Sequence, residues 1–393
     1  MQELLSGISL LILVFQVPAV FVLLSRLLKG PFRQPPIQPQ SPTPELLGNV
    51  SVVVPTLNEV ERISPLLTGL SKQSYEVREV IVVDSNSQDG TRDLVKATIE
   101  KDPRFRLITD DPLPKNWVGR PWALHNGFLN TSAASEWFLG MDADTQPAPG
   151  LVAGLVKTAS ALDYDLVSLS PQFILQYPGE SLLQPALLMT LLYRFDPAGV
   201  NAQSSERVMA NGQCFLCRRS VLEQVNGYTS AKSSFCDDVT LARQIAATGF
   251  KVGFLDGAKV LKVRMYEGAA ETWKEWGRSL DLKDASSRAQ TWGDLWLLTS
   301  VQGLPLIIVL LFLFLSSPFS FSPSFPSFLL WLNLFLILIR FLMLYAIAPS
   351  YDFTQNKGGW LFWLSPIADP LAVLRIFLSA LRTPRQWRGR EYG

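Results

Sequence analysis

Histidine and cysteine are scarce in this sequence: it has one histidine, His125, and three cysteines. Three cysteines cannot build the disulfide framework of a small secreted domain. Cys214 and Cys217 form a C-x-x-C pair, but no second pair completes a zinc site. We therefore interpret these cysteines, together with Cys236, as thiols of the core rather than redox or metal-binding groups. The position of His125 favours a helix residue with satisfied polar atoms over a catalytic base.

Charge is also scarce. Asp, Glu, Lys and Arg make up 18% of the chain, and 35 basic residues nearly balance 34 acidic ones. A net charge near zero gives no indication of nucleic acid as a partner. Hydrophobic residues make up 48%, which together with the low charge points to the membrane.

Long uncharged runs take the place of charge at both ends. Residues 4–25 carry no charged side chain, which is long enough for a helix to span a bilayer. A cleaved signal peptide is disfavoured because the first three residues have no basic side chain and the run is too long. By the positive-inside tendency, the basic residues that follow place the next segment in the cytoplasm. We predict a transmembrane helix at 1–30 and a stiff Pro-rich linker at 31–49.

The C-terminal region, 286–393, is predicted to be a membrane region. Its uncharged run is split by a Ser-, Pro- and Phe-rich stretch, which predicts spans at about 295–315 and 327–348. Arg340 lies inside the second span, where it either snorkels or faces a polar partner or acceptor. A full span at 360–381 would put the basic tail outside, so we favour a re-entrant or interfacial segment there, with the tail in the cytoplasm.

Residues 50–169 alternate short β-branched or apolar runs with segments of helical spacing. The runs at 50–54, 79–83, 105–108 and 137–141 predict strands, and helices are predicted between them. Continuous apolar strands separated by helices imply an α/β fold, a mostly parallel sheet with helices on both faces. Right-handed crossovers then bring the carboxyl ends of the strands to one edge, where ligands bind.

Two carboxylates, Asp142 and Asp144, follow the last of these runs. Residues i and i+2 of a strand point the same way, and two close anions need a cation or a shared proton. Carboxylate oxygens suit Mg²⁺ or Mn²⁺, which predicts a metal that grips a diphosphate. A strand followed by an acidic turn is the alternative. We expect both carboxylates at the metal site. Asp144 is the better candidate for the metal itself, and Asp142 is expected to contact the ribose or the donor sugar in addition.

Polar clusters also follow the first two strands, at 55–59 and 84–90. Because all these strand ends meet at one edge, we expect a cleft that reads the base and ribose of a nucleotide. Asp84 is expected to contact the base or ribose, whereas Asp89 is expected to cap the next helix.

The motifs Pro-Thr-x-Asn-Glu, Asp-Ser-x-Ser-x-Asp-Gly-Thr and Asp-Ala-Asp together resemble family 2 glycosyltransferases with the GT-A fold. Residues 119–127 resemble their Gly-Lys-x-x-Ala-Leu-Asn-x-Gly stretch, with Arg120 in the Lys position. Residues 112–119 are similar to a segment of the subgroup that glycosylates carotenoids and hopanoids, including cyanobacterial carotenoid 2′-O-glycosyltransferases. The resemblance covers about 50–280 and implies a Rossmann-like GT-A catalytic domain at 50–285 that takes a UDP- or GDP-sugar. The donor-binding residues it implies are Pro55, Thr56, Asn58, Glu59, Asp84, Arg120, Asp142 and Arg278.

A second acidic pair, Asp237 and Asp238, opens a predicted helix. Helix N-termini stabilise carboxylates, so a purely structural role is one reading. Inverting sugar transfer needs a carboxylate to take the proton of the acceptor hydroxyl. Asp238 matches the Asp of the family's Glu-Asp or Asp-Asp motif, so we predict that it is the base. Arg120 is either a forked, permanently charged diphosphate ligand or a solvated residue at a helix start.

The acceptor side is predicted from Gln213 and from Trp273 and Trp276, which share one helix face. Such an aromatic pair either stacks on a sugar or lies at the membrane interface. We favour an interfacial helix over a core helix for the apolar segment 182–193. Processive relatives carry Gln-x-x-Arg-Trp near 274–278, and this chain departs from that pattern, with Arg278 displaced.

These observations favour an integral membrane enzyme with a cytoplasmic catalytic domain, which transfers one sugar to a lipid hydroxyl. A carotenoid is the favoured acceptor, with hopanoid, sphingolipid and glycerolipid open. One alternative is a processive polysaccharide synthase. A catalytically dead membrane scaffold is the other, and the presence of both acidic pairs disfavours it.

Overall fold

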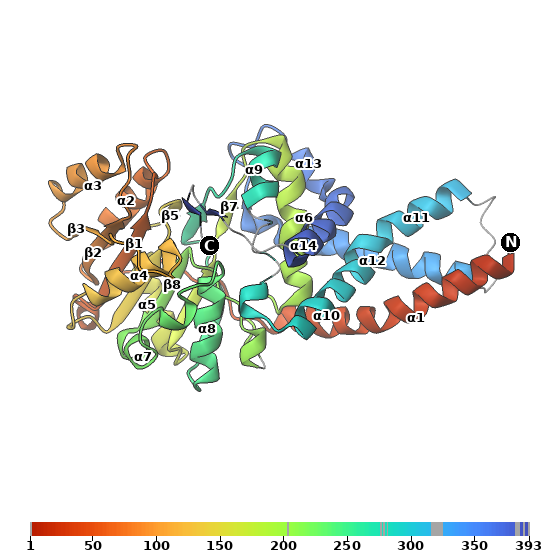
Figure 1. The fold of residues 1–393 in the computed structure, drawn as a ribbon, viewed down its shortest axis with the longest axis horizontal. Helices are drawn as coiled ribbons and strands as arrows, with labels where there is room; N and C mark the ends of the chain where they lie inside the picture. Colours follow the sequence, from red (N-terminus) through yellow and green to blue (C-terminus); the bar gives the residue numbers. More distant parts are fainter. Residues whose placement is uncertain are drawn as a thin grey trace. The chain divides into compact units, whose positions relative to one another are not determined.

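The computed structural model describes residues 2–202, 204–275, 277, 280, 282–315, 325–381, 386–387 and 390–391. The chain divides into two compact units, each continuous in space but not in sequence (Figure 1). The α/β unit consists of 32–174, 198–265 and 384–393, and the helical unit consists of 1–31, 175–197 and 266–383. Residues 175–197 and 266–285, which the sequence assigned to the catalytic domain, therefore lie in the helical unit.

A seven-stranded sheet with the order β3-β2-β1-β4-β8-β6-β9 forms the α/β unit. Neighbouring strands are parallel except where β8 runs antiparallel between β4 and β6, so the sheet is mixed and mostly parallel, as predicted. Its strands are β1 Val50–Thr56, β2 Val77–Asp84, β3 Phe105–Thr109, β4 Trp137–Met141, β6 Leu166–Ser170, β8 Cys214–Arg218 and β9 Val252–Asp256.

Helices cover both faces of this sheet, which confirms the prediction. On one face, Val52 and Val54 belong to a core cluster with residues of α2 (Ile63–Ser71), α3 (Thr91–Ile99) and α5 (Leu151–Ala161). On the other face, Val53 packs against α4 (Gly119–Leu129), where a Cβ on Gly127 would come within 2.3 Å of the Val53 side chain. Each fully buried valine contributes about 1.5–3 kcal/mol. α7 (Arg219–Gln224) and α8 (Asp237–Ala247) complete the unit.

The strand order places the candidate site. The chain builds β1, β2 and β3 outward and then crosses back to β4 on the other side of β1. Ligands of open α/β sheets bind where the order reverses in this way, at the carboxyl ends of the strands. Residues 56–59 follow β1 and residues 142–144 follow β4, so both segments lie at this switch point.

The segment predicted as a linker lies along the α/β unit. Its backbone nitrogens at Gln34, Ile37 and Gln40 donate to the carbonyls of Gly199, Asp256 and Gly150 at 2.8–3.1 Å. Three short strands pair beside the sheet, since β10 (Leu261–Val263) is antiparallel to β5 (Thr145–Pro147) and parallel to β7 (Gln172–Ile174). All three cysteines are buried free thiols, as predicted.

Within the described residues, three helices are long and apolar enough to cross a membrane: Glu3–Phe32, Arg288–Phe314 and Phe325–Ser350. The second begins well before the predicted residue 295, because α10, a π-helical turn at Thr299–Gly303 and α11 continue one another. The sequence-based prediction began the span where the uncharged residues begin. It missed the true start because the charged residues Arg288 and Asp294 lie within the helix. The helices of the helical unit are α1 Gln2–Leu27, α6 Pro178–Arg194, α9 Gly268–Glu275, α10 Arg288–Leu298, α11 Leu304–Leu315, α12 Phe325–Ile347, α13 Trp360–Trp363 and α14 Asp369–Leu381.

The interfacial prediction for 182–193 was wrong. These residues form most of α6, which packs against α9, α14 and α10 within the helical unit. Ala186, Leu187 and Met189 are fully buried there. Apolar residues around most of a helix are typical of a buried helix as well as of an interfacial one, so the pattern alone did not separate the two.

Candidate active site

Asp142 and Asp144 lie in the turn that joins β4 to β5. The strand ends at Met141, so the i, i+2 argument for an extended strand does not apply to them. The turn is closed by Thr145, whose backbone N–H and hydroxyl both donate to the carbonyl of Asp142, at 3.3 and 2.7 Å. The acidic turn foreseen as the alternative is therefore present, and it holds two carboxylates at the switch point of the sheet.

Arg120, in the first turn of α4, joins this turn to α8. Its guanidinium donates to Oδ1 of Asp142 from Nε at 2.9 Å, and Nη2 lies 2.8 Å from the same oxygen. Nη1 donates to Oδ2 of Asp237. Burial works against the charge, but the two carboxylates outweigh it and raise the pKa of Arg120 above its usual value. The solvated helix-start reading is therefore wrong, because the side chain is mostly buried in an ion-pair network.

Gly212 allows Arg120 to reach this position. Nη2 of Arg120 donates to the Gly212 carbonyl at 2.9 Å. A Cβ at residue 212 would come within 2.2 Å of Nη2, so any side chain there displaces the guanidinium. Sequence reasoning did not single out Gly212, although it stands beside the predicted acceptor ligand Gln213.

The two carboxylates of α8 differ in environment. Asp237 is buried, which raises its pKa, and Arg120 opposes that rise. Asp238 is half-buried; its Oδ2 accepts from the backbone N–H of Gly212 at 2.7 Å and its Oδ1 from that of Val239 at 2.8 Å. Both residues lie in the first helical turn, so the helix terminus stabilises them whatever their chemistry. In these contacts Asp237 forms the ion pair with Arg120, whereas Asp238 accepts hydrogen bonds from backbone N–H groups.

Asp144 differs from Asp142 in its hydrogen bonding. Its Oδ1 is buried and has no hydrogen-bond partner within the described ranges. Burial, together with the charge of Asp142, raises the pKa of Asp144 to about 7, although Arg62 opposes that rise. Buried carboxylate oxygens are ordinarily hydrogen-bonded, so an oxygen without a partner needs an explanation such as an ion.

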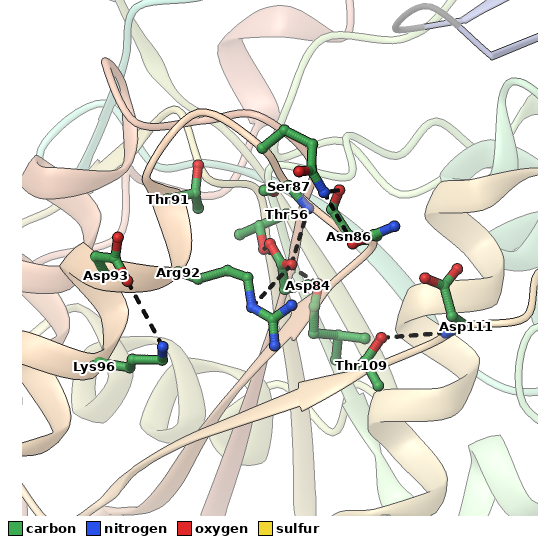
Figure 2. A network of polar contacts seen from close by, with 12 residues as sticks. Thr56, Asp84, Asn86, Ser87, Thr91, Arg92, Asp93, Lys96, Thr109 and Asp111 are labelled. Atoms are coloured by element: carbon green, nitrogen blue, oxygen red, sulfur yellow. Dashed lines mark hydrogen bonds and ion pairs between the residues drawn. The ribbon is translucent and has the colours of Figure 1, made fainter.

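Asp84, at the end of β2, is buried among protein groups (Figure 2). Its Oδ1 accepts from the hydroxyl of Thr56 at 3.2 Å, and its Oδ2 accepts from the backbone N–H of Ser87 at 3.0 Å. Nε of Arg92 lies 3.8 Å from Oδ2. Asp84 therefore fixes the 85–90 loop against β1.

The loop after β1 is held to the loop after β2. Asn58, in the left-handed region at φ +56°, accepts from the N–H of Gln88 at 2.9 Å, and its own N–H donates to Ser87. The N–H of Glu59 donates to the hydroxyl of Thr91. Asp89 accepts from the N–H groups of Thr91 and Val60 at 3.0 Å. The N-cap of α3 is Gly90, so the predicted N-cap position of Asp89 was wrong by one residue, although its carboxylate accepts from the first N–H of the helix. Both loops present their polar groups at one edge. Pro55 is the penultimate residue of β1.

Comparison with known proteins shows what the α/β unit resembles. Residues 51–225 match the model of glycosyl transferase family 2. Residues 51–225 are thus similar to a family 2 glycosyltransferase domain. A 4,4'-diaponeurosporenoate glycosyltransferase of Staphylococcus haemolyticus is 25% identical over 245 residues, which are 62% of this chain and 64% of that protein. An undecaprenyl-phosphate 4-deoxy-4-formamido-L-arabinose transferase of Serratia proteamaculans is 35% identical over 126 residues, 31% of this chain and 37% of that protein.

The match to these two relatives spans less than two thirds of their length. Among solved structures, the mannosyltransferase PcManGT from Pyrobaculum calidifontis, in complex with GDP-Man and Mn²⁺, superposes with a TM-score of 0.50 at 18% identity. The superposition covers 96% of this chain and 99% of that one. Likeness at this identity concerns the fold alone, and it agrees with the predicted GT-A architecture.

The chemistry of the acidic turn suits a divalent metal, for which Asp144 would be a ligand. Among the residues that the structure describes, no three His, Cys, Asp or Glu side chains converge to hold a metal by themselves. Mg²⁺ is commonly held by one or two carboxylates together with substrate phosphates and water rather than by a full protein cage. A buried carboxylate oxygen without a partner beside a second carboxylate matches that requirement.

The predicted acceptor residues Gln213 and Trp273 belong to different units of the chain. Gln213 is buried, and its side-chain oxygen accepts from the amide of Asn211 at 3.0 Å. Trp273 lies on α9 in the helical unit, where the guanidinium of Arg375 lies 5.7 Å from its ring and donates to its backbone carbonyl. Trp276 and Arg278 lie outside the described residues.

Two arginines near the site escaped the sequence analysis. Arg62 exerts its charge on Asp144, and its Nη1 donates to the carbonyl of Met265 at 3.4 Å. Arg92 pairs with Asp84 from the first turn of α3. Neither belongs to the motifs quoted above, but each lies within a few residues of one, and a search for basic residues beside strand-end loops would have found both.

His125 is a packed helix residue, as expected. Its Nδ1 accepts from the N–H of Tyr228 at 3.3 Å, and the rings of Trp117 and Trp122 lie 5.1 and 5.9 Å away. Burial lowers the pKa of His125.

Proposed function

We propose that the chain is a membrane-bound, inverting glycosyltransferase that moves a sugar from a UDP- or GDP-sugar to a hydroxyl of a lipid. The observation that carries the proposal is the carboxylate turn of a family 2 domain, in which Oδ1 of Asp144 is buried without a partner. Arg120 holds Asp142 beside it and ties it to the carboxylates of α8. The arrangement provides a metal ligand and a base at the switch point of one sheet.

The donor is proposed to lie along the edge formed by the loops after β1, β2 and β4. The loops at 56–59 and 84–90 read its base and ribose through backbone groups and side chains held by Asp84. Asp144 holds Mg²⁺ or Mn²⁺, with Asp142 beside it. When bound, this metal neutralises the charge that grows on the departing diphosphate. Arg120 keeps the turn in place and presents a fixed cation to the same group.

The transfer itself needs a base on the opposite face of the sugar. The acceptor hydroxyl attacks the anomeric carbon, the bond from that carbon to the diphosphate breaks, and Asp238 takes the hydroxyl proton. We assign this role to Asp238 rather than Asp237 because the ion pair with Arg120 occupies Asp237. The Gly212 N–H orients the Asp238 carboxylate and leaves it half-exposed.

A lipid acceptor is proposed from the three helices that are long enough to cross a membrane. Among lipids we favour a carotenoid, which the sequence resemblance and the Staphylococcus haemolyticus relative support. Two relatives that act on undecaprenyl phosphate make a polyprenyl phosphate the second candidate. Arg26 in the last turn of α1, followed by Lys29 and Arg33, supports a cytoplasmic catalytic domain in an integral membrane protein.

Transfer by the purified full-length chain tests the proposal. The chain in lipid nanodiscs is given UDP- or GDP-sugars, Mg²⁺ or Mn²⁺, and either a hydroxylated carotenoid or a polyprenyl phosphate, and products are identified by mass spectrometry. We expect a single sugar on the carotenoid hydroxyl, with loss of product in EDTA. A polymer built from one nucleotide sugar would establish a processive synthase instead. If no combination of donor and acceptor gives sugar transfer or hydrolysis of the nucleotide sugar, the result would favour a catalytically dead scaffold.

Lipid and pigment profiling of a deletion strain tests the acceptor in cells. We expect one glycosylated pigment to disappear while its aglycone accumulates. A changed polysaccharide with unchanged lipids would contradict the acceptor assignment.

A further inference from the structure

A buried ion pair joins α12 to α14 inside the helical unit. Arg340 donates from Nε to Oδ2 of Asp369 at 2.8 Å and from Nη2 to Oδ1 at 3.1 Å. Nη2 also donates to the hydroxyl oxygen of Ser365 at 3.1 Å. Arg340 therefore faces a polar partner rather than snorkelling. Because Asp369 engages it through two oxygens, the charge of the guanidinium is already balanced.

Gln302, on the π-helical turn between α10 and α11, belongs to the same network. Its side-chain nitrogen donates to the Ala186 carbonyl at 2.8 Å and to Oδ1 of Asp369 at 3.1 Å. Both partners are acceptors, so the amide nitrogen must face them and the amide oxygen must face away. π-helical turns inside longer helices are frequent at functional sites.

This network leaves one donor and one acceptor without partners. Within the part of the chain that the structure describes, Nη1 of Arg340 and Oε1 of Gln302 are buried and make no hydrogen bond. Each residue is only 3% exposed. A buried polar atom without a partner costs about 1–3 kcal/mol, and native structures contain few of them. A group that both accepts and donates a hydrogen bond would satisfy the two together.

A cavity of about 140 Å³ is lined by Arg340, Gln302 and Asp369 together with apolar side chains of α11, α12 and residues 363–367. One water occupies a share of about 30 Å³ in the liquid, so the cavity holds much more than a bridging water. Its lining also includes Phe341, Trp363 and Ile367, whose side chains are exposed on the helical unit. A mainly apolar lining with one polar end fits a hydrocarbon chain that carries a polar group.

We propose that this cavity is a subsite for the hydroxyl-bearing part of an apolar lipid. The hydroxyl oxygen accepts from Nη1 of Arg340, and the hydroxyl hydrogen is donated to Oε1 of Gln302. A carboxylate or phosphodiester fits less well, because it has no hydrogen to donate and would add an unbalanced charge beside Asp369. The inference rests on the proposed function, transfer of a sugar to a lipid. It adds that the helical unit selects a hydroxylated apolar lipid.

Photolabelling of the full-length chain in phosphatidylcholine nanodiscs, without nucleotide sugar, tests the subsite. The probe is hexadecanol with a diazirine near the hydroxyl and a terminal alkyne, and the matched probes are the corresponding hexadecanoate and the hydrocarbon without hydroxyl. We expect the alcohol to label peptides containing 301–306 and 336–341 about tenfold more than the hydrocarbon, as two modest hydrogen bonds allow. Equal labelling by the hydrocarbon, or stronger labelling by hexadecanoate, would overturn the proposal.

Substitutions separate the cavity from general lipid contact. Leu306 lines the cavity, so Leu306→Trp fills it and is expected to abolish the preference for the alcohol. Leu311→Trp adds the same side chain at an exposed position outside the lining and is expected to keep that preference. Gln302→Met removes the acceptor and is expected to lower labelling by the alcohol but not by the hydrocarbon. An unchanged preference in Leu306→Trp would contradict the subsite. Should Gln302→Met fail to fold, the alcohol–hexadecanoate comparison in the unmodified chain decides.

Labelling and transfer distinguish this inference from the proposed function. Selective labelling without any sugar transfer would support the subsite and count against the proposed function. Transfer to a lipid at the unmodified rate in Leu306→Trp, without selective labelling of the native chain, would overturn the subsite and leave the proposed function standing.

Discussion

Nη2 of Arg120 lies 2.8 Å from Oδ1 of Asp142, so the first carboxylate of the acidic turn is balanced by a cation from α4. Asp144, two residues on, has a buried oxygen without a partner in the described chain. The two carboxylates of one motif are thus in different electrostatic states. This difference supports the division in which Asp144 holds the metal and Asp142 contacts the donor sugar or ribose.

Asparagine at each position tests that division. Asp144→Asn removes the anionic ligand, and we expect the affinity for Mn²⁺ together with nucleotide diphosphate to fall about 100-fold, the upper end of losses seen for groups that support metal sites. Asp142→Asn is expected to have a smaller effect on the metal. Isothermal titration calorimetry of the full-length chain with Mn²⁺ and UDP or GDP measures both.

Asp93→Asn is the matched control for these variants, because Asp93 is an exposed carboxylate on α3 of the same unit. It is expected to bind metal and nucleotide as the unmodified chain does. Equal losses in Asp142→Asn and Asp144→Asn would remove the distinction between the two carboxylates.

Replacement of Arg120 is expected to destabilise the α/β unit. Arg120→Met leaves Asp142 and Asp237 without their shared cation, and breaking a buried ion pair costs about 3–5 kcal/mol. Arg120→Lys keeps the charge but loses the fork that serves two carboxylates, so we expect an intermediate loss. Chemical unfolding followed by tryptophan fluorescence provides the measurement.

The double variant Arg120→Met with Asp237→Asn provides the check. Since it removes one of the uncompensated charges, it is expected to be more stable than Arg120→Met alone. Additive losses from the two substitutions would mean that the contact between these side chains carries no coupling energy.

Asp238→Asn is expected to lower turnover about 10²–10⁴-fold, the usual range for a positioned base, while donor binding is retained. Asp237→Asn acts through Arg120, so it is expected to shift the unfolding temperature more than Asp238→Asn does. Steady-state kinetics and thermal unfolding separate the two roles. An Asp238→Asn protein that transfers sugar at the unmodified rate would exclude Asp238 as the base.

His125 is expected to make the protein sensitive to acid. Burial lowers the pKa of His125 in the folded state, so the unfolded chain binds the proton first as the pH falls through its ordinary range near 6.5. Stability should therefore be fully present above that range and decrease as the pH falls toward the folded pKa. Because the chain has one histidine, NMR of ¹³C-histidine-labelled protein reads its titration without assignment.

His125→Gln is expected to remove that part of the pH dependence. The measurement is the free energy of unfolding at pH values above and below about 6.5. A folded-state pKa above 6.5 would contradict the interpretation of His125 as a half-buried group whose neutral form is favoured.

Local patterns determined the α/β architecture. The runs of β1, β2 and β4 indicated three strands, because continuous apolar runs of this length are typical of strands buried on both faces of a covered parallel sheet. The partly exposed run of β3 indicated the fourth strand, which lies at the edge of the sheet. Loop positions followed from the handedness of crossovers, so the meeting of 56–59 with 142–144 was predictable. The metal role of Asp144 was also proposed from the sequence, since two adjacent carboxylates at a strand end are costly without a cation.

Only the tertiary structure decided which charges pair. The contacts of Arg120 with Asp142 and Asp237 join positions 22 and 117 residues apart, and no local pattern encodes a partner at that distance. The same holds for Arg340 and Asp369, which the sequence left between snorkelling and pairing. The burial of α6 was likewise undecided, because an apolar helix satisfies a protein core and a membrane interface equally well by composition. Periodicity and turn chemistry act between neighbours in the chain, whereas charge pairing and burial depend on which elements the fold brings together.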